Sequence, residues 1–284
     1  EALLNRFPLE AGISPGFKVM DERAFQALAA ETQAKILQQT ESDALKKALQ
    51  RLTRRMNETG FNTLCKAITE KRQDFAAQSS DKRRDGLMDM LGVTKHIPPE
   101  SFGATFIKGI SRETLADAAN CLKKSGTNDQ KLAVLIEALL SALDKFTDFE
   151  MLHPALEDFF MTDKGPRAKF ATKAVAAEFP TETGYLLELQ HIYIRLREDF
   201  LAQLILQISL DIYSLADALL AEIDLKKTQQ GYLDYDDLIF YADKLLSNRR
   251  DTGWVLYKLD GGIDHILVDE AQDTSPRQWS VISA

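Results

Sequence analysis

One stretch limits the possible folds more than any other, because it contains almost nothing that interrupts a helix. Between Thr183 and Thr228 the only proline or glycine is Gly184. At about 1.5 Å per residue, an amphipathic helix here would reach up to about 65 Å, with at most one break. We expect it to be the spine of a helical domain, with its aromatic side chains in the core rather than stacked on bases. The apolar residues that recur at spacings of three and four are Leu186, Leu189, Tyr193, Leu196, Phe200, Leu204 and Ile208.

The segments before this spine are also rich in helix formers. Residues 22–58 consist largely of Ala, Leu, Gln, Glu and Lys, which favour helices. Asp21 and Ser42 precede helical segments and are suited to accept hydrogen bonds from the first amides. Gly60 is suited to end a helix, and residues 61–75 are expected to form another.

Three further patterns complete the expected mainly α organisation. Residues 78–86 are polar and are interpreted as a connector. Thr127 and Gln130 have the spacing of a capping box, which predicts a helix from there to about Phe146. Residues 17–20 predict a short strand.

Composition and charge bound the possible functions. The chain has 284 residues, of which 45% are hydrophobic, enough for a sizeable core and too many for a disordered chain. The net charge of −8 is opposite to the basic footprint of a DNA-binding protein, so strong nonspecific binding by this chain alone is not expected. Local basic patches are still compatible with it, because salt screens exposed charges beyond about 8 Å.

Cysteines and apolar runs argue against other classes. Cys65 and Cys121 fit no metal-binding or redox spacing, so we expect reduced, buried thiols. The most apolar long stretch, residues 200–210, is interrupted by Gln203 and Gln207, which argues against a membrane span. No signal peptide is visible, and a cytoplasmic location is expected.

The C-terminal segment has a pattern that suits phosphate chemistry. The apolar run 266–268 predicts a strand buried on both faces of a parallel sheet, and Asp269 and Glu270 follow it directly. Ser275 and Gln278, with a proline between them, have the spacing of a capping box and predict that a helix begins there. Carboxylates at the carboxyl end of a parallel strand lie where open α/β sheets bind ligands.

Two neighbouring carboxylates can divide the work of nucleotide hydrolysis. Phosphoryl transfer needs a carboxylate near Mg²⁺ and a second group that orients the attacking water. Side chains of successive strand residues diverge, so we expect Asp269 to hold Mg²⁺ and Glu270 to polarise the water. An Asp-Glu pair can equally be a plain helix start, which is expected for Asp21 and Glu22. The polar run from Gln272 to Pro276 favours the functional interpretation.

These residues resemble a known family. The run Leu267–Pro276, LVDEAQDTSP, resembles motif II, the Walker B segment, of superfamily 1A helicases of the UvrD/RecB type. Leu233–Ile239, LDYDDLI, is similar to the segment that precedes motif II in that group. Leu4–Gly12 and Trp254–Asp260 are similar to segments of the AddA family, the helicase-nuclease subunits of AddAB complexes, of the alphaproteobacterial kind.

The resemblance implies a fold and an activity. Residues 21–230 would be the helical accessory domain 1B of a superfamily 1 helicase, with small α/β remnants of the RecA-like motor domain 1A at 1–20 and 231–284. The complete protein would be an ATP-dependent 3′–5′ DNA helicase and exonuclease. It would act with the AddB subunit in double-strand break repair and recombination, in the bacterial cytoplasm at the nucleoid. ATP and Mg²⁺ would be its cofactors, and Gln272 would link the γ-phosphate state to DNA-bound motifs.

Part of that machinery is not in this sequence. The family's phosphate-binding loop ends in Gly-Lys-Thr or Gly-Lys-Ser, and the chain contains no Gly-Lys pair. We therefore interpret the chain as an internal piece of a larger protein, and expect it to bind no ATP and to be inactive by itself. Two other interpretations stay open: a helical DNA- or protein-binding module with an inert terminal motif, and another P-loop ATPase.

Residues 161–173 are the best nucleic-acid candidate. They hold one acid and four basic residues, Lys164, Arg167, Lys169 and Lys173. The Gly-Pro turn predicts a following helix on which Lys169 and Lys173 share a face and contact phosphates. The alternative is a solvated basic loop.

Two local expectations concern the motor-like ends. Residues 234–237 contain three acids, and we expect a helix start with Asp234 as N-cap rather than a metal site, because the spacing is not that of an EF-hand. The strand at 265–269 should pair with 17–20, or else leave an exposed edge that pairs between molecules.

Overall fold

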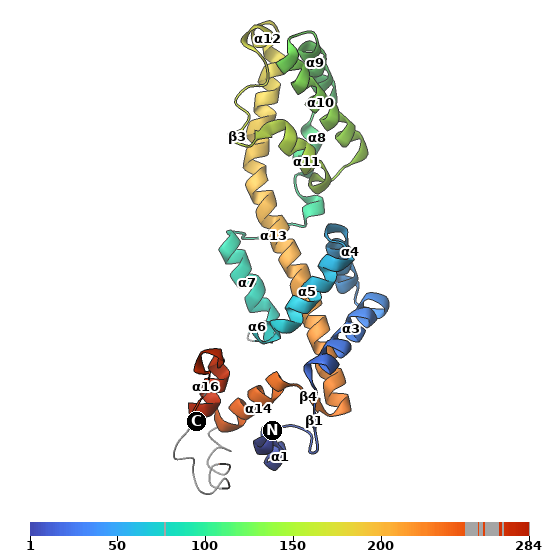
Figure 1. Cartoon of the computed structure of the whole chain (residues 1–284). Helices are drawn as coiled ribbons and strands as arrows, with labels where there is room; N and C mark the ends of the chain where they lie inside the picture. The colour runs from blue at the N-terminus through green and yellow to red at the C-terminus, as the bar shows by residue number, and fades with distance from the viewer. Residues whose placement is uncertain (77, 248–254, 256–257, 259–266, 269, 284) are drawn as a thin grey trace. The chain divides into compact units, whose positions relative to one another are not determined.

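The chain folds into two compact units. The computed structural model describes residues 1–76, 78–247, 255, 258, 267–268 and 270–283. The terminal unit consists of Glu1–Ala77 and Ser214–Ala284, and the central unit of Gln78–Tyr213 (Figure 1). This division lies inside the predicted segment 21–230, whose assignment to accessory domain 1B stays a prediction.

The predicted spine is confirmed as one continuous helix. Helix α13 (Pro180–Gln230) has 51 residues, and the break that the sequence allowed is not present. By length and composition alone it could cross a membrane. The polar residues of its most apolar part nevertheless have protein partners: Gln203 donates to the carbonyl of Lys95 at 2.9 Å, and Gln207 to the carboxylate of Asp211 at 2.9 Å. Such contacts are typical of a helix packed inside a protein.

The central unit packs short helices and one small hairpin against the first part of α13. Its strands β2 and β3 pair antiparallel, with Met161 opposite Pro166. Its other elements are helical. They are α7 (Ser80–Leu91), η1 (Pro99–Ser101), α8 (Ala104–Gly109), α9 (Arg112–Lys123), α10 (Thr127–Lys145), α11 (Phe149–Phe160) and α12 (Lys173–Glu178), and the hairpin strands are β2 (Met161–Thr162) and β3 (Gly165–Pro166).

Two sequence predictions in the central unit are wrong in detail. The expected connector at 78–86 is mostly helix α7, because the Ser79 hydroxyl accepts from the amide of Lys82 at 3.5 Å and caps it. The predicted helix from Thr127 exists, but Gly126 is its N-cap and no side chain caps it. The capping box is absent there because the Gln130 amide group instead donates to the carbonyl of Ser125 at 3.0 Å.

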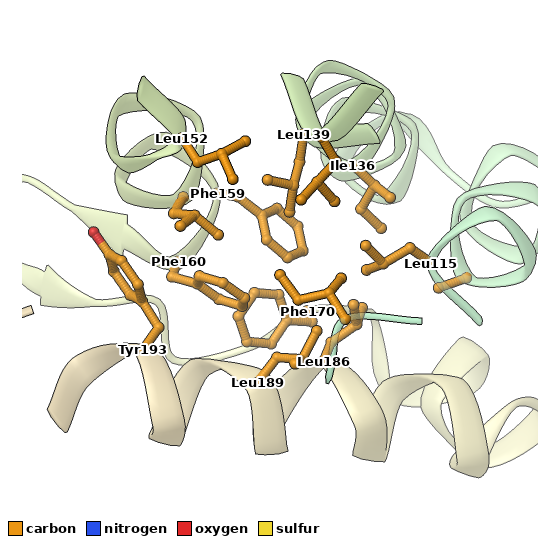
Figure 2. Packing of buried hydrophobic residues seen from close by; sticks show 14 of the residues in the cluster. Leu115, Ile136, Leu139, Leu152, Phe159, Phe160, Phe170, Leu186, Leu189 and Tyr193 are labelled. Carbon is orange, nitrogen blue, oxygen red and sulfur yellow. The ribbon is translucent and has the colours of Figure 1, made fainter. Parts of the chain in front are cut away.

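An aromatic core holds the central unit together. Figure 2 shows labelled side chains from α10, α11 and α13 converging on one interior. The Phe160 ring stacks on Tyr193 with centroids 5.3 Å apart, and Phe149 lies 4.9 Å from Phe200. Aromatic pairs at such distances add about 0.5–1.5 kcal/mol each to their burial. The prediction that the aromatic residues of the spine are core residues is therefore confirmed for Tyr193 and Phe200, which are fully buried.

The terminal unit combines both chain ends with the last part of α13. Predicted N-caps are confirmed at Asp21, which accepts from the amide of Ala24 at 2.7 Å, and at Ser42, which accepts from Leu45 at 3.3 Å. Its elements are α1 (Ala2–Arg6), α2 (Pro8–Ala11), β1 (Lys18–Val19), α3 (Glu22–Gln39), α4 (Asp43–Arg55), α5 (Glu58–Glu70), α6 (Arg72–Ala76), β4 (Tyr232–Leu233), α14 (Tyr235–Ser247), η2 (Ala271–Asp273) and α16 (Pro276–Ser283).

Gly60 does not end a helix. It lies in the first turn of α5, where its amide donates to the Asn57 side chain at 2.9 Å. Asn57 is a strong N-cap, so the helix starts just before the glycine instead of stopping at it. The cysteines are free thiols as expected: Cys65 is buried, which raises its pKa to about 11, whereas Cys121 is only partly buried.

The two ends of the chain share one apolar core. Leu4, Phe7 and Phe17 from the N-terminal segment are buried together with Leu233 and Leu245. This brings together the two segments that the resemblance assigns to motor domain 1A.

The predicted strand at 17–20 is confirmed as β1. It pairs in parallel with β4, which follows α13, with Val19 opposite Leu233. The predicted pairing of 17–20 with 265–269 stays a prediction, as does its alternative, an edge that pairs between molecules. Leu267 and Val268 are not in a strand, and Leu267 is 99% exposed instead of buried on both faces. Residues 265, 266 and 269 lie outside the described residues.

Candidate functional site

The turn that carries the motif II pattern presents a carboxylate to solvent. Glu270 is exposed and has φ 50° and ψ 45°, the left-handed region that costs a side-chain-bearing residue roughly 1–2 kcal/mol. Within the described residues it is the one non-glycine residue with a positive φ. The Gln272 side-chain amide donates to the Glu270 carboxylate. Strain of this kind gathers at functional sites, where the surrounding structure maintains it.

A helix follows this turn as the sequence predicts. The Ser275 hydroxyl accepts from the amide of Gln278 at 3.3 Å, and the Gln278 side chain accepts from the amide of Ser275 at 2.7 Å. This reciprocal pair is the predicted capping box, and α16 begins directly after Ser275. Helix α16 packs against α14, where the guanidinium of Arg277 lies 5.3 Å from the centroid of the Phe240 ring.

The chemistry of the turn fits Mg²⁺ with a nucleotide. Such ions are held by one or two carboxylates together with phosphates and water, not by an all-protein cage. Asp269, the predicted Mg²⁺ ligand, lies outside the described residues, so the fit rests on its neighbour Glu270. Across the part of the chain that the structure describes, no group of three or more His, Cys, Asp or Glu side chains is placed to hold a metal ion by itself.

The acidic segment before motif II starts a helix in the predicted way. The amide of Asp237 donates to the Asp234 carboxylate at 3.0 Å, so Asp234 is the N-cap of α14. The amide of Asp234 in turn donates to the Asp237 carboxylate at 3.0 Å. The two acids therefore cap each other's backbone amides, as a Ser and a Glu do in a capping box.

Two cations that the sequence did not single out meet these acids. Lys227, in the last turns of α13, is buried and lies 3.0 Å from the Asp234 carboxylate and 2.7 Å from that of Asp237. Arg72 of α6 lies 2.9 Å from the Asp234 carboxylate and 2.7 Å from that of Asp236. We call Arg72, Lys227, Asp234 and Asp237 the buried charge cluster.

The electrostatics of this cluster follow from burial opposed by pairing. Burial lowers the pKa of Lys227, but the carboxylates of Asp237 and Asp234 outweigh it and raise the pKa overall. Burial raises the pKa of Asp234, and the opposing attraction of Lys227, an amide hydrogen bond and Arg72 bring it below its ordinary value. For Asp237 burial prevails over Lys227, and the pKa is raised. The lysine is thus held in its charged form.

The basic segment of the central unit differs from its prediction at Arg167. This side chain is half-buried, and its guanidinium donates to the carbonyls of Phe159 at 2.8 Å and Asp158 at 3.2 Å. It closes the C-terminal end of α11, where unpaired carbonyls attract a cation. Burial lowers the pKa of Arg167. Arg167 therefore has a structural role at the end of α11, whereas Lys164, Lys169 and Lys173 are exposed.

The predicted helix face that joins Lys169 and Lys173 does not exist. Helix α12 begins only at Lys173, so Lys169 lies in the irregular segment before it. That segment is held extended because the amide and the hydroxyl of Thr172 donate to the Asp129 carboxylate at 2.9 and 2.8 Å. Phe170 is buried in the core beside it.

A family model matches the entire chain. It describes the UvrD/REP helicase N-terminal domain and aligns with residues 1–284. The chain belongs to the UvrD/REP helicase family. Among curated proteins, none matches the chain. The family assignment therefore rests on the family model, and the motif II pattern of the sequence agrees with it.

Membership of the UvrD/REP family gives an activity class. The family consists of ATP-dependent DNA helicases, whose cofactors are ATP and Mg²⁺. Of the predicted site residues, the structure brings Glu270 and Gln272 into contact. The basic segment belongs to the other unit.

One signal in this UvrD/REP sequence points to the lysine that the sequence analysis missed. Leu219, Ile223 and Lys227 are four residues apart on α13, and all three are buried. A lysine at a position where the helical period places core residues needs an acidic partner nearby. The acids of 234–237 follow closely in the sequence and supply it. Arg72 has no comparable signal.

Proposed function

We propose that this UvrD/REP chain is the segment of an AddA-type helicase-nuclease subunit that extends from accessory domain 1B through motif II. The finer assignment is supported by the similarity of Leu4–Gly12 and Trp254–Asp260 to that family. The complete protein would unwind DNA in the 3′–5′ direction, degrade it as an exonuclease, and act with an AddB subunit in double-strand break repair.

The observation that carries the ATPase proposal is the strained, exposed Glu270 beside Gln272. A general base must reach a water molecule next to the reacting phosphate, and an exposed carboxylate in the Walker B segment is suited to this. Glu270 would accept the proton of that water, and Asp269 would hold the Mg²⁺, which would supply positive charge next to the phosphates.

Gln272 positions this carboxylate. Its amide donates to one carboxylate oxygen of Glu270, which restricts the rotation of the acid. The Gln272 side chain would also sense whether the γ-phosphate is present, because the γ-phosphate and the Glu270 carboxylate would compete for the hydrogens of its amide group. This is how Gln272 would link nucleotide state to DNA.

The test is Glu270→Gln in the helicase that contains this chain. Turnover of ATP should fall by at least about 10²-fold, the scale expected when a general base is lost, while ATP binding stays nearly intact. Glu10→Gln is a matched control, because Glu10 is an exposed acid of the same unit. An unchanged rate of ATP hydrolysis or unwinding in Glu270→Gln would refute the assignment.

We propose DNA contact for Lys164, Lys169 and Lys173 of the central unit. All three are exposed, and no salt bridge of theirs occurs among the residues that the structure describes. Lysines in this state bind phosphates by releasing counterions. Arg167 does not belong to this group, because its guanidinium is already bonded to the end of α11.

Replacement of these three lysines by alanine should weaken duplex binding by the helicase, and the loss should shrink as salt rises. The matched control replaces Lys108, Lys124 and Lys131, which are exposed lysines of the same unit, and so changes the net charge equally. If the two triple variants bind DNA with equal affinity across a salt titration, the segment is a solvated basic loop and not a DNA contact.

A further inference from the structure

We propose that the buried charge cluster is a positioning device for motif II: Lys227 and Arg72 fix the start of α14, and α14 fixes α16 and the Glu270 turn. The inference rests on the proposed role of Glu270. It assigns to Lys227 a part in ATP hydrolysis without contact with the nucleotide.

The first step is that Lys227 is committed to α14. Its side chain is 5% exposed, and the carboxylates of Asp234 and Asp237 lie within 3.0 Å of its ammonium group. An ammonium removed from water needs such partners. Its remaining acid, Asp224, lies one turn earlier in α13 at 3.4 Å. A movement of α14 away from α13 would therefore leave buried charges unpaired.

The second step is that α14 is held from another direction as well. Arg72 donates to Asp234 at 2.9 Å, and its guanidinium also lies 4.7 Å from the centroid of the Phe25 ring in α3. Asp234 therefore receives hydrogen bonds from Lys227, Arg72 and the Asp237 amide. Donors from different elements fix both the place and the direction of the first turn.

The third step connects α14 to the motif. Helix α16 packs on α14, and beside this contact Leu238 and Ile239 of α14 line an apolar groove together with Val281 and Ile282 of α16. Arg277, at the start of α16, covers Phe240. Since α16 begins directly after the motif II run, its place on α14 determines where the Glu270 turn can lie.

Charge pairing suits this purpose better than apolar contact. Apolar surfaces can slide with little loss because their attraction is not directional, whereas hydrogen-bonded ion pairs tolerate only a narrow geometry. A catalytic carboxylate misplaced by about 1 Å can lose a factor of about 10² in rate. Directional bonds at the start of α14 would keep such displacement small.

The test measures ATP hydrolysis by the helicase that contains this chain. The variants are Lys227→Met, the milder Asp237→Asn, and Lys226→Met as matched control. Lys226 is the neighbouring lysine of α13, and its partner is Glu31 of α3 at 2.8 Å instead of an acid of α14. Rates are expressed per ATP-binding site titrated in each preparation, so that unfolded protein does not count.

The expected result is a fall of kcat by at least about 10-fold in Lys227→Met, with an unchanged KM for ATP because the nucleotide contacts remain. Asp237→Asn should show the same change to a smaller extent, and decides the matter if Lys227→Met does not fold. Lys226→Met should have wild-type kcat. A merely structural role would change melting temperature and leave kcat per titrated site intact.

Two outcomes overturn the proposal: normal kcat in either cluster variant, or an equal fall of kcat in Lys226→Met. Failure of the underlying function has a separate signature, because Glu270→Gln would then leave turnover unchanged. A helicase that loses turnover in Glu270→Gln and keeps it in Lys227→Met retains the motif II assignment and rejects the positioning cluster.

Discussion

The core of the central unit and the junction of α13 with α14 in the terminal unit hold their elements in place by opposite means. The core of the central unit is built from rings and aliphatic side chains, with Phe149, Phe159 and Phe160 fully buried. The junction of α13 with α14 in the terminal unit is built from charges, and its central residue Lys227 is as inaccessible as a core leucine. The core of the central unit excludes water from apolar surface, and the α13–α14 junction excludes water from ion pairs.

The difference shows what each kind of packing provides. Apolar burial stabilises by about 25 cal/mol per Å² without specifying direction. Buried ion pairs regain at best what desolvation costs, so they contribute little net stability. They do fix orientation. In this molecule the charges lie at the start of α14, on which the helix that follows motif II packs, whereas the aromatic core lies in the unit with the basic segment.

The largest effect on stability is expected from a substitution in the charged region. Lys227→Met should destabilise the terminal unit by about 3–5 kcal/mol, because it removes the buried ammonium group that pairs with both Asp234 and Asp237 and leaves Asp234 with Arg72 alone. Hydrogen exchange resolved by segment would check this. The amides of α14 should exchange faster while those of α10 keep their protection. Faster exchange in α10 to the same degree would show that the two regions are not independent.

The second-largest effect on stability is expected from a substitution in the apolar core of the central unit. Leu139→Ala should cost about 3 kcal/mol, within the usual range for a fully buried leucine, because transfer energy is lost and a cavity is left. The loss should not depend on salt or pH, since no charge is involved. Denaturant unfolding at two salt concentrations measures this, and a salt-dependent loss would contradict a purely apolar core.

The third effect sharpens the comparison, because the central unit also holds a buried acid, Asp129. Burial raises the pKa of Asp129, but hydrogen bonds from Ser125 and Thr172 outweigh it, so that the pKa lies below its ordinary value. A lowered carboxyl pKa contributes stability that is fully present above the unfolded value, near pH 4, and is lost as pH falls through the folded value. The central unit should therefore weaken in acid.

Thr172→Val removes the hydroxyl bond to Asp129 and should cost about 1.5–3 kcal/mol at pH 7, the range for a hydrogen bond to a charged group. In this variant the free energy of unfolding should also fall less steeply than in the wild type as the pH is lowered below about 4. Thr183→Val is the control, because the Thr183 hydroxyl donates to a neutral carbonyl of the same unit. A steeper fall in Thr172→Val than in the wild type would contradict the sign.

The parts of the fold that were predictable rest on contacts within a few residues of sequence. Asp21, Ser42 and Ser275 cap their helices because donor and acceptor are three residues apart. The long spine was predictable because its period repeats over many turns. Gly60 and Thr127 show the limit: a better local competitor, such as the Asn57 cap, changes the boundary.

The parts that were not predictable depend on residues far apart in sequence. The partner of β1 is β4, more than two hundred residues later. Asp129 keeps Thr172 out of a helix from a distance of 43 residues. Arg72 reaches Asp234 across 162 residues. At the candidate site the turn and helix of motif II were predictable, whereas the cluster beneath them required the fold.

The smallest expected effect tests whether burial, rather than charge pairing as such, separates the two regions. Lys226 and Lys227 are neighbours in α13, and each pairs with an acid, but the Glu31 side chain that Lys226 meets is 72% exposed. The solvent already stabilises such a charge, so exposed pairs contribute little. Lys226→Met also keeps most of the aliphatic stem, which is the buried part of that side chain. Its unfolding midpoint should match the wild type, and a loss equal to that of Lys227→Met would mean that position on α13 matters, not burial.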